Sequence, residues 1–414
     1  MGQLILCVLG MYTILDYSAG RGVPYWRQAY AVVCVCVVLS LARKHWAGRV
    51  SRRIGMILVI WMGLSVFWFL PALAHLDVYW IYIVGDLAMV VLPALFLLAG
   101  CRYPNLFDDE QSLRGLGAWL LVAAIIAPLL ANQLWSSSHH RGGRFDPPDV
   151  LLMAILWVAL VNARSPLHVL ACLALVIGTG LLSFLSGMRT HLGLWVLAGM
   201  IAIAGKQLTL RTARYFIGVC AVGIVAIVIL AAATDKGVPG LAQLKSAISS
   251  SRYSKLGSKD QSLANRIDEV RDVLLAIRSN PNPLAIFFGN GHGATFSPVR
   301  SFPERNITRD FRVHQIHIGP AMLLYRYGLI GLAIAAWCCF MVGADVLWLI
   351  GGRNISRAMA VFVIAMVLSL TNGMFRNVLN EPMFSFTLAG YLYLRFATNR
   401  QQIWRLSKMI QPYP

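Results

Sequence analysis

The stretch IGMILVIWMGLSVFWFLPALAHLDVYWIYIVGDLAMVVLPALFLLA, residues 54–99, decides the fold class. It contains two apolar runs, 54–73 and 78–99, and each is long enough to cross the roughly 30 Å hydrocarbon core of a bilayer as a helix. Similar runs recur along the 414 residues, of which 58% are apolar and 13% charged. Soluble domains usually carry about 25% charged residues, and disordered chains contain far fewer apolar ones. The sequence therefore predicts an all-α polytopic membrane protein.

We expect about twelve membrane-spanning helices, because apolar runs recur from end to end. The predicted spans are residues 3–18, 28–42, 54–73, 78–99, 115–132, 148–163, 166–186, 190–204, 215–233, 318–345, 356–372 and 381–396. The first is interpreted as a retained span and not as a signal peptide, because no basic residue precedes its apolar core.

The distribution of basic residues predicts the orientation. Lys and Arg together number 36 against 17 acidic residues. With both termini in the cytoplasm, 17 basic residues fall in the inner loops and tail and six in the short outer loops, as the positive-inside rule requires. The basic excess is therefore a topological signal and does not indicate nucleic-acid binding. The predicted domains are 1–233 with spans one to nine, an outward loop 234–317, and 318–414 with three spans and the tail.

A helix is expected in the outward loop over residues 262–280, SLANRIDEVRDVLLAIRSN. Five apolar residues recur there at helical spacing, namely Leu263, Ile267, Val270, Leu274 and Ile277. Asp268 and Asp272 are expected on the opposite face. Such an amphipathic helix either lies on the bilayer or covers a cavity.

Arg266 falls inside this apolar stripe, between Val273 and Ile277. One interpretation is that its guanidinium reaches toward water or pairs with Glu269 one turn later. The other is that it points into a cavity that holds an anion.

The next segment, FFGNGHG at residues 287–293, contains three glycines in five residues. Glycines permit positive φ and a close approach of a ligand to the backbone. No lysine or serine follows as in a phosphate-binding P-loop, so a plain turn is the favoured interpretation. His292 is either a ligand contact or a solvated residue.

Two histidines three residues apart, His314 and His317, precede the tenth predicted span. Zinc sites need three or four ligands, and none of the eight cysteines lies in 234–317. We therefore expect no metal there, and a neutral imidazole acting as a general base is the better hypothesis.

Three ionisable residues are expected within or beside spans. Arg189, in SFLSGMRTH at 183–191, has no acid nearby in sequence, and a cation so placed is costly unless it is paired or functional. A functional role is favoured for it. Asp86 and Arg326 lie at similar depth, and a structural ion pair between them is expected.

These motifs together resemble those of the O-antigen ligase and polymerase superfamily of bacterial inner-membrane glycosyltransferases. His317 precedes Gly328 of the sequence Gly-Leu-Ile-Gly by 11 residues, as in the family pattern. The stretch around Arg189 and the pair Asn265-Arg266 are similar to the family's two arginine motifs. The family pattern usually has Asn, Ser or Gln after the histidine, where this chain has Ile318, so both histidines remain candidates and the spacing favours His317.

The resemblance implies an O-antigen ligase of lipopolysaccharide biosynthesis, a metal-independent and cofactor-free glycosyltransferase. It would move an O-antigen glycan from undecaprenyl diphosphate to lipid A-core at the periplasmic face of the inner membrane, with inversion. The implied partners are this lipid-linked donor, the lipid A-core acceptor and the bilayer, without nucleic acid.

The implied roles follow the motifs. Arg189 and Arg266 would bind the diphosphate, His317 would abstract the acceptor proton, and His314 would support it. The remaining candidates are Glu269, which would orient Arg266, and Arg144 and Asp146, which would contact the acceptor.

Alternative functions share some of these features. An O-antigen polymerase and an O-linked protein oligosaccharyltransferase would use the same chemistry with another acceptor. A transporter or flippase of lipid-linked glycans is less favoured, because the unusual polar residues concentrate at the outer rim.

Overall fold

The computed structural model describes residues 51–73, 76–134, 149–185, 189–205, 218, 261–299, 301, 312–314, 318–351, 355–375 and 382–396. These residues are mostly helical and contain no β-strand, only an isolated antiparallel bridge between Phe296 and Val313. The helices are α3 (Arg52–Ala72), α4 (Leu76–Arg102), α5 (Asn105–Asp108), α6 (Glu110–Leu134), α7 (Val150–Asn162), α8 (Pro166–Leu185), α9 (Arg189–Ala204), α12 (Gln261–Arg278), α13 (Ala285–Phe288), α14 (Gly319–Ile350), α15 (Arg357–Phe375) and α16 (Pro382–Phe396).

Five of these helices are long and apolar enough to cross a membrane, which is compatible with a membrane protein. They are Arg52–Ala72 in α3, Tyr82–Arg102 in α4, Pro166–Ser183 in α8, Gly319–Ile350 in α14 and Arg357–Met374 in α15. Each coincides with a predicted span, and the shorter apolar helices α7 and α9 coincide with two more.

The predicted spans 3–18, 28–42 and 215–233 lie outside the described residues. The count of twelve, the three domains and the outward position of 234–317 therefore stay predictions.

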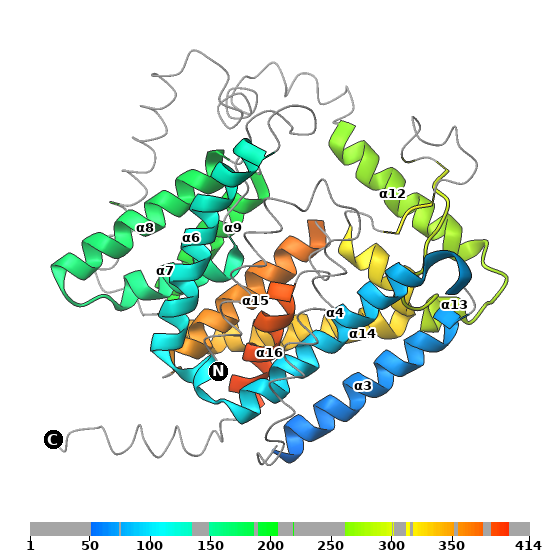
Figure 1. Cartoon of the computed structure of the whole chain (residues 1–414), viewed down its shortest axis with the longest axis horizontal. Helices are drawn as coiled ribbons and strands as arrows, with labels where there is room; N and C mark the ends of the chain where they lie inside the picture. Colours follow the sequence, from blue (N-terminus) through cyan, green and yellow to red (C-terminus); the bar gives the residue numbers. More distant parts are fainter. Residues whose placement is uncertain are drawn as a thin grey trace.

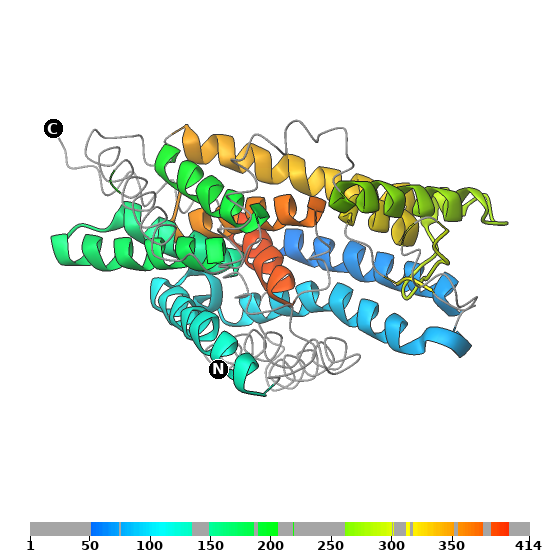
Figure 2. The ribbon, with the colours of Figure 1, turned by 90° about the horizontal axis from the view of Figure 1, so that it is seen from above.

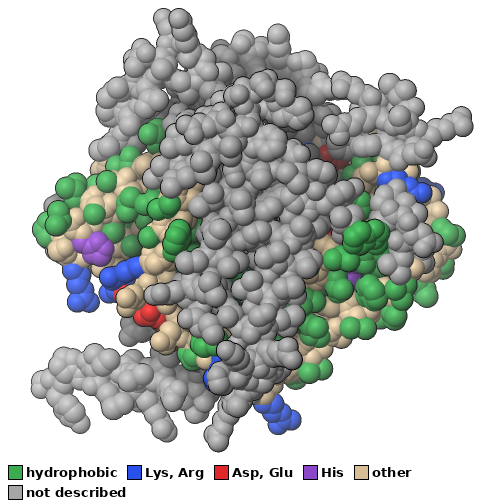
Figure 3. Space-filling view, in the orientation of Figure 1, with side chains coloured by type: hydrophobic (Ala, Val, Ile, Leu, Met, Phe, Trp, Pro, Cys, Tyr) green, Lys and Arg blue, Asp and Glu red, His purple; other side chains and the backbone are tan. Residues whose placement is uncertain are grey.

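The surface of the candidate spans is apolar. Val59 of α3 is 73% exposed, Leu167 of α8 is 77% exposed and Phe340 of α14 is 72% exposed. Figure 3 shows hydrophobic side chains on the described surface to both sides of the grey residues. Because a water-soluble helix normally presents polar residues on its outer side, these exposed positions fit contact with lipid.

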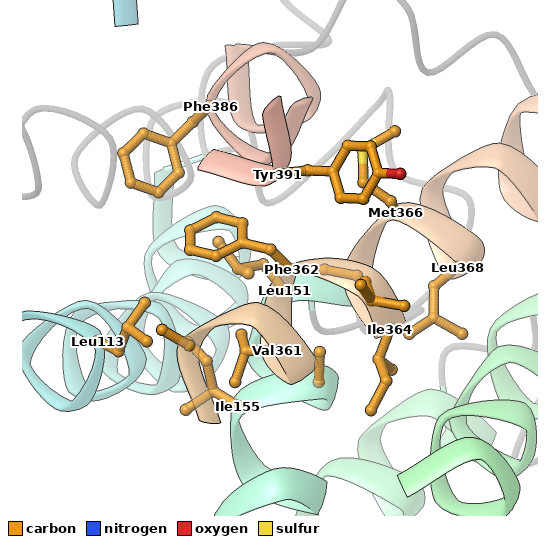
Figure 4. Close-up of a cluster of buried hydrophobic side chains, with 14 of the residues drawn as sticks. Leu113, Leu151, Ile155, Val361, Phe362, Ile364, Met366, Leu368, Phe386 and Tyr391 are labelled. Atoms are coloured by element: carbon orange, nitrogen blue, oxygen red, sulfur yellow. The ribbon is translucent and has the colours of Figure 1, made fainter. Parts of the chain in front are cut away.

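The core lies where α7, α15 and α16 meet (Figures 1 and 4). Trp157 of α7, Phe362 of α15 and Phe386 of α16 are each at most 1% exposed. The rings of Phe362 and Phe386 lie 6.1 Å apart. Helix α16 also packs against α4, and α15 packs against α9 and α14, so these two C-terminal helices join the N-terminal and central helices.

A buried charged cluster links α14 to α16. Arg395 forms an ion pair with Asp345 and donates a hydrogen bond to the Met341 carbonyl at 2.9 Å. Tyr391 donates to Asp345 Oδ2 at 2.7 Å. Because an unpaired charge is costly among apolar helices, these three bonds fix α16 against the C-terminal part of α14.

Gly390 tests the packing of α16 on α15. A Cβ atom added at Gly390 would overlap the buried ring of Phe362, whereas one added at Gly343 of α14 would meet nothing within 4 Å. We expect Gly390→Ala to lower the free energy of unfolding by about 1–3 kcal/mol through overpacking. Gly343→Ala, the matched control, should be neutral or stabilising by about 0.5–1 kcal/mol. Thermal unfolding in detergent measures both, and equal effects would contradict this packing.

Candidate functional site

Several elements meet at one end of the helix bundle. The C-terminal end of α3, the N-terminal part of α4, α12, α13 and the beginning of α14 lie together there, on the right of Figure 1. Figure 2 shows α12 alongside the first part of α14. Residues 289–299, 301 and 312–314 lie at the same end, so the candidates Arg266, Glu269, His292 and His314 all come to it.

Helix α14 is interrupted at Gly328, whose φ of 65° and ψ of −163° are not helical. The interruption leaves backbone carbonyls of the preceding turn without their helical partners. The Tyr325 carbonyl accepts from the Asn290 backbone N–H at 3.0 Å, and the Arg326 carbonyl accepts from the Gly291 N–H at 2.8 Å. Residues 289–293, the glycine loop, therefore supply the hydrogen bonds that the broken helix loses, as interrupted membrane helices require.

Glycine is needed where these two backbones touch. A Cβ atom at Gly289 would overlap the Arg326 carbonyl, and one at Gly328 would overlap the Phe287 carbonyl. Gly289 has φ of 76°, so both positions also lie in the left-handed region that side chains rarely adopt.

The five backbone N–H groups of the glycine loop all have protein acceptors. Gly289 donates to Ala285, Asn290 and Gly291 donate to α14, and His292 donates to the Trp68 carbonyl. Gly293 donates to Asp86 Oδ2 at 2.8 Å. A phosphate loop needs several free N–H groups pointing at its ligand. The loop is therefore a buried turn, as the sequence favoured, and not a phosphate cradle in this conformation.

Asp86 of α4 and Arg326 of α14 form the expected ion pair, with Arg326 Nη1 3.0 Å from Asp86 Oδ1. Both side chains are 3% exposed. Arg326 Nη2 also donates to the backbone carbonyl of His314. The pair thus joins two candidate spans and the segment before α14 in one cluster.

His314 completes this cluster. Its Nε2 lies 3.3 Å from Asp86 Oδ1, and its Nδ1 lies 3.1 Å from Arg326 Nη2. Arg326 Nη2 also lies 2.9 Å from Nε2, so this guanidinium nitrogen is close to both ring nitrogens. Burial of the ring, reinforced by the Arg326 charge, lowers the pKa of His314 below its ordinary value. Because both nitrogens are engaged, His314 suits positioning better than proton abstraction.

His292 is buried and not solvated. Its Nε2 lies 3.2 Å from the Ser65 carbonyl, and its Nδ1 lies 3.3 Å from the Tyr327 hydroxyl. Burial lowers the pKa of His292 as well. With 1% exposure and both nitrogens bonded, His292 holds α3, the glycine loop and α14 together, and a ligand contact is not open to it in this conformation.

Helix α12 packs on the beginning of α14 through Val273, which contacts a small apolar cluster that includes Phe296, Met322 and Tyr325. Arg266 is half-buried on the edge of this packed side, and Glu269 is buried one turn later. The two form no ion pair within the described residues. By helical geometry Asp272 lies on the face of α12 opposite the apolar stripe, as expected, and it is buried there. Asp272 is 1% exposed and accepts from the Ser301 backbone N–H at 2.7 Å.

The remaining candidates lie outside what the structure describes. His317, Arg144 and Asp146 are not among the described residues, and Arg189 begins α9 without a described side chain. Within the described part of the chain, no group of three or more His, Cys, Asp or Glu side chains could hold a metal ion. The structure therefore brings together His292 and His314 with Asp86 and Arg326, and it places Arg266 and Glu269 on the neighbouring helix.

Comparison with known proteins adds no assignment. No protein-family model matches the chain, and no curated protein matches it.

The Asp86–Arg326 pair gives a stability prediction. Asp86→Asn leaves a buried guanidinium without its counter-charge, so it should lower the free energy of unfolding by about 3–5 kcal/mol. Arg326→Gln should cost a similar amount, and the double variant should cost clearly less than the sum of the two. Thermal unfolding in detergent measures the cycle.

A matched control uses the exposed pair of Glu110 and Arg357, whose nitrogen and oxygen atoms lie 2.9 Å apart. Glu110→Gln should cost about 0–1 kcal/mol, because water screens that pair. Additive costs for Asp86→Asn and Arg326→Gln would show that the buried pair contributes no coupling.

The histidines give a pH prediction. Since burial lowers the pKa of His314 and His292, the folded state binds fewer protons than the unfolded state below about pH 6.5, the ordinary histidine value. Stability should therefore be full above this pH and fall on acidification through it. His314→Gln should reduce the dependence of the thermal midpoint on pH between neutral and mildly acidic buffer. An unchanged dependence would mean that His314 does not titrate in this way.

Proposed function

We propose that the protein is a glycosyltransferase that moves a glycan from undecaprenyl diphosphate to lipid A-core at the periplasmic face of the bacterial inner membrane. In this reaction the acceptor hydroxyl oxygen attacks the anomeric carbon, the bond from that carbon to the diphosphate oxygen breaks, and the lipid diphosphate leaves. The acceptor proton passes to a base, and the anomeric configuration inverts.

The observation that carries the proposal is the anchoring of the chain on both sides of His317. His314 is held by Arg326 and Asp86, and Ile318 is the N-cap residue of α14. General base catalysis needs an imidazole held within hydrogen-bond reach of the acceptor proton. These fixed positions of His314 and Ile318 support such a role for His317, and we assign His314 as a positioning residue.

The chemistry of arginine supports a donor that carries a diphosphate. A guanidinium fork binds phosphate oxygens in a bidentate manner and can stabilise the charge that develops on a leaving diphosphate. Arg266 is half-buried at the edge of α12, and no hydrogen bond or ion pair holds it among the described residues. It is therefore open to a phosphate. We assign Arg189 to the same diphosphate by the resemblance of its motif.

The orientation is supported by the basic residues at the ends of the helices. Arg52 begins α3 and Arg102 ends α4, both at the end of these helices that is remote from the Asp86 cluster. The positive-inside rule then assigns the remote end to the cytoplasm and the cluster to the periplasmic side.

A transporter of lipid-linked glycans is the second candidate, because one observation favours it. Transporters bind substrates at interrupted helices and place ionisable groups within their spans, and α14 has both an interruption at Gly328 and the buried Arg326. In this chain the protein itself satisfies the interrupted backbone and Arg326, so neither is open to a substrate in this conformation.

His317→Ala tests the proposal. Loss of a general base typically slows a reaction by about 10²–10⁴-fold, so transfer should nearly stop while donor binding is retained. His314→Ala should lower the thermal midpoint as well as activity, because it breaks the buried cluster. Transfer from undecaprenyl-diphosphate glycan is measured in nanodiscs, alongside donor affinity and the midpoint.

The outcomes separate the candidates. A dead His314→Ala enzyme of normal stability with an active His317→Ala enzyme would reverse the two roles. Glycan flipping between leaflets without any transfer product would identify the transporter. Supplying lipid A-core, a second lipid-linked repeat or a pilin-like protein as acceptor separates a ligase from a polymerase and from a protein oligosaccharyltransferase.

Metal independence is a further prediction of the arginine assignment. Because guanidinium groups would neutralise the leaving diphosphate, transfer should continue in excess chelator at the rate measured without it. Restoration of a lost activity by magnesium or manganese would show that a cation, and not Arg266 and Arg189, stabilises the leaving group.

A further inference from the structure

Three consecutive residues of α12 point in three directions, because each helical residue turns the chain by about 100°. Val273 is fully buried against α14. Leu274 is 50% exposed, and Leu275 is 40% exposed in yet another direction. The helix thus has a packed side, a side that carries Leu274, and a third side that carries Leu275.

The side of Leu274 is apolar. Ile267, seven residues earlier, shares its direction and is exposed as well. The side of Leu275 is shared by Asp268, which pairs with Arg271 at 3.5 Å. The helix thus has a packed side, an exposed apolar side and an exposed side that carries charges. These three sides fit contact with protein, lipid and water, respectively.

The elements near α12 also expose apolar side chains. The segment after α12 exposes Leu284, Ile286 and Phe287, the last at 52%. This segment sits at the C-terminal end of the candidate span α3, where the Phe288 ring lies 5.3 Å from Phe67 and the Phe288 carbonyl accepts from Trp68 Nε1 at 3.1 Å. Val66 and Leu70 of α3 are also exposed. Exposed apolar side chains therefore occur both on the span and on the segment that contacts its end.

The arrangement of α12 fits the membrane interface. In Figure 1, α12 runs crosswise to α3 at the end where α3 stops. Arg271 and Arg278 are exposed on α12, and by helical geometry their directions fall between those of Leu274 and Leu275. Arginines so placed can bury their stems along the apolar side and hold their charges at the level of anionic headgroups.

We propose that α12 and α13 dock on the bilayer, with Ile267, Leu274 and Phe287 in the acyl region of one leaflet and Arg271 and Arg278 on anionic lipid headgroups. The occupant is the phospholipid surface. The docking does not depend on the proposed transferase activity, and it is tested without any substrate.

The test uses the full chain in vesicles of phosphatidylethanolamine and phosphatidylglycerol. Leu274, Leu275 or Phe287 is replaced by photoreactive p-benzoylphenylalanine, and adducts are identified by mass spectrometry after illumination. We expect lipid adducts at 274 and 287 at several-fold the yield at 275, which is the matched control because it is the adjacent leucine of similar exposure. The thermal midpoint of each variant before illumination should equal that of the unmodified chain, as these side chains are exposed.

Two results would overturn the docking. Equal lipid yields at 274 and 275 would show that α12 has no lipid-facing side, and an adduct between two copies of the chain at 274 would identify this surface as a protein interface. The headgroup contact is tested separately. Arg271→Gln with Arg278→Gln should remove a preference for phosphatidylglycerol among the adducts at 274 while the adducts themselves remain. A preference that survives both changes would overturn the assignment of the arginines.

Discussion

The buried carboxylate of Asp86 is the constraint on which this end of the molecule depends. A carboxylate inside an apolar helix bundle needs counter-charge and hydrogen bonds. Asp86 obtains them from the Arg326 guanidinium, the Gly293 N–H and the His314 ring. These partners belong to a second candidate span, a loop and the segment before that span. Satisfying one charge therefore fixes the relative positions of four parts of the chain.

The interruption of α14 and the glycine loop depend on each other in the same way. Without the loop, the break at Gly328 would leave carbonyls unpaired among apolar side chains, and without the break the loop would lose two acceptors. Glycines at the contact allow the two backbones to approach closely. Helix, loop and ion pair thus form one cooperative unit, and its two neutral histidines link stability to pH.

The sequence predicted the parts of this unit that depend on local patterns. The apolar runs predicted the five candidate spans, and the similar depth of Asp86 and Arg326 within their spans predicted that the two residues pair. The sequence did not predict that His314 contacts this pair. Residues 312–314 have no periodic pattern from which the direction of the His314 side chain could be inferred. The burial of Asp272 was not predicted, because the sequence left open whether the apolar stripe of this helix lies on the bilayer or covers a cavity. In a membrane protein an apolar side can face lipid, while the packed side carries acids bonded to a loop.

Charged residues that are paired within the protein also differ from charged residues that are open to a substrate. Asp86 and Arg326 are satisfied by each other and by the loop, so binding a substrate anion to Arg326 would first require breaking a buried pair. Arg266 is half-buried on α12, at the boundary between the packed side and the proposed lipid-facing side. A phosphate attached to a lipid lies at the level of the headgroups, where a helix docked on the bilayer would hold this guanidinium. The buried charges would then fix the position of the base, and the interfacial helix would present the arginine to the donor, so that each function uses the charge whose surroundings permit it.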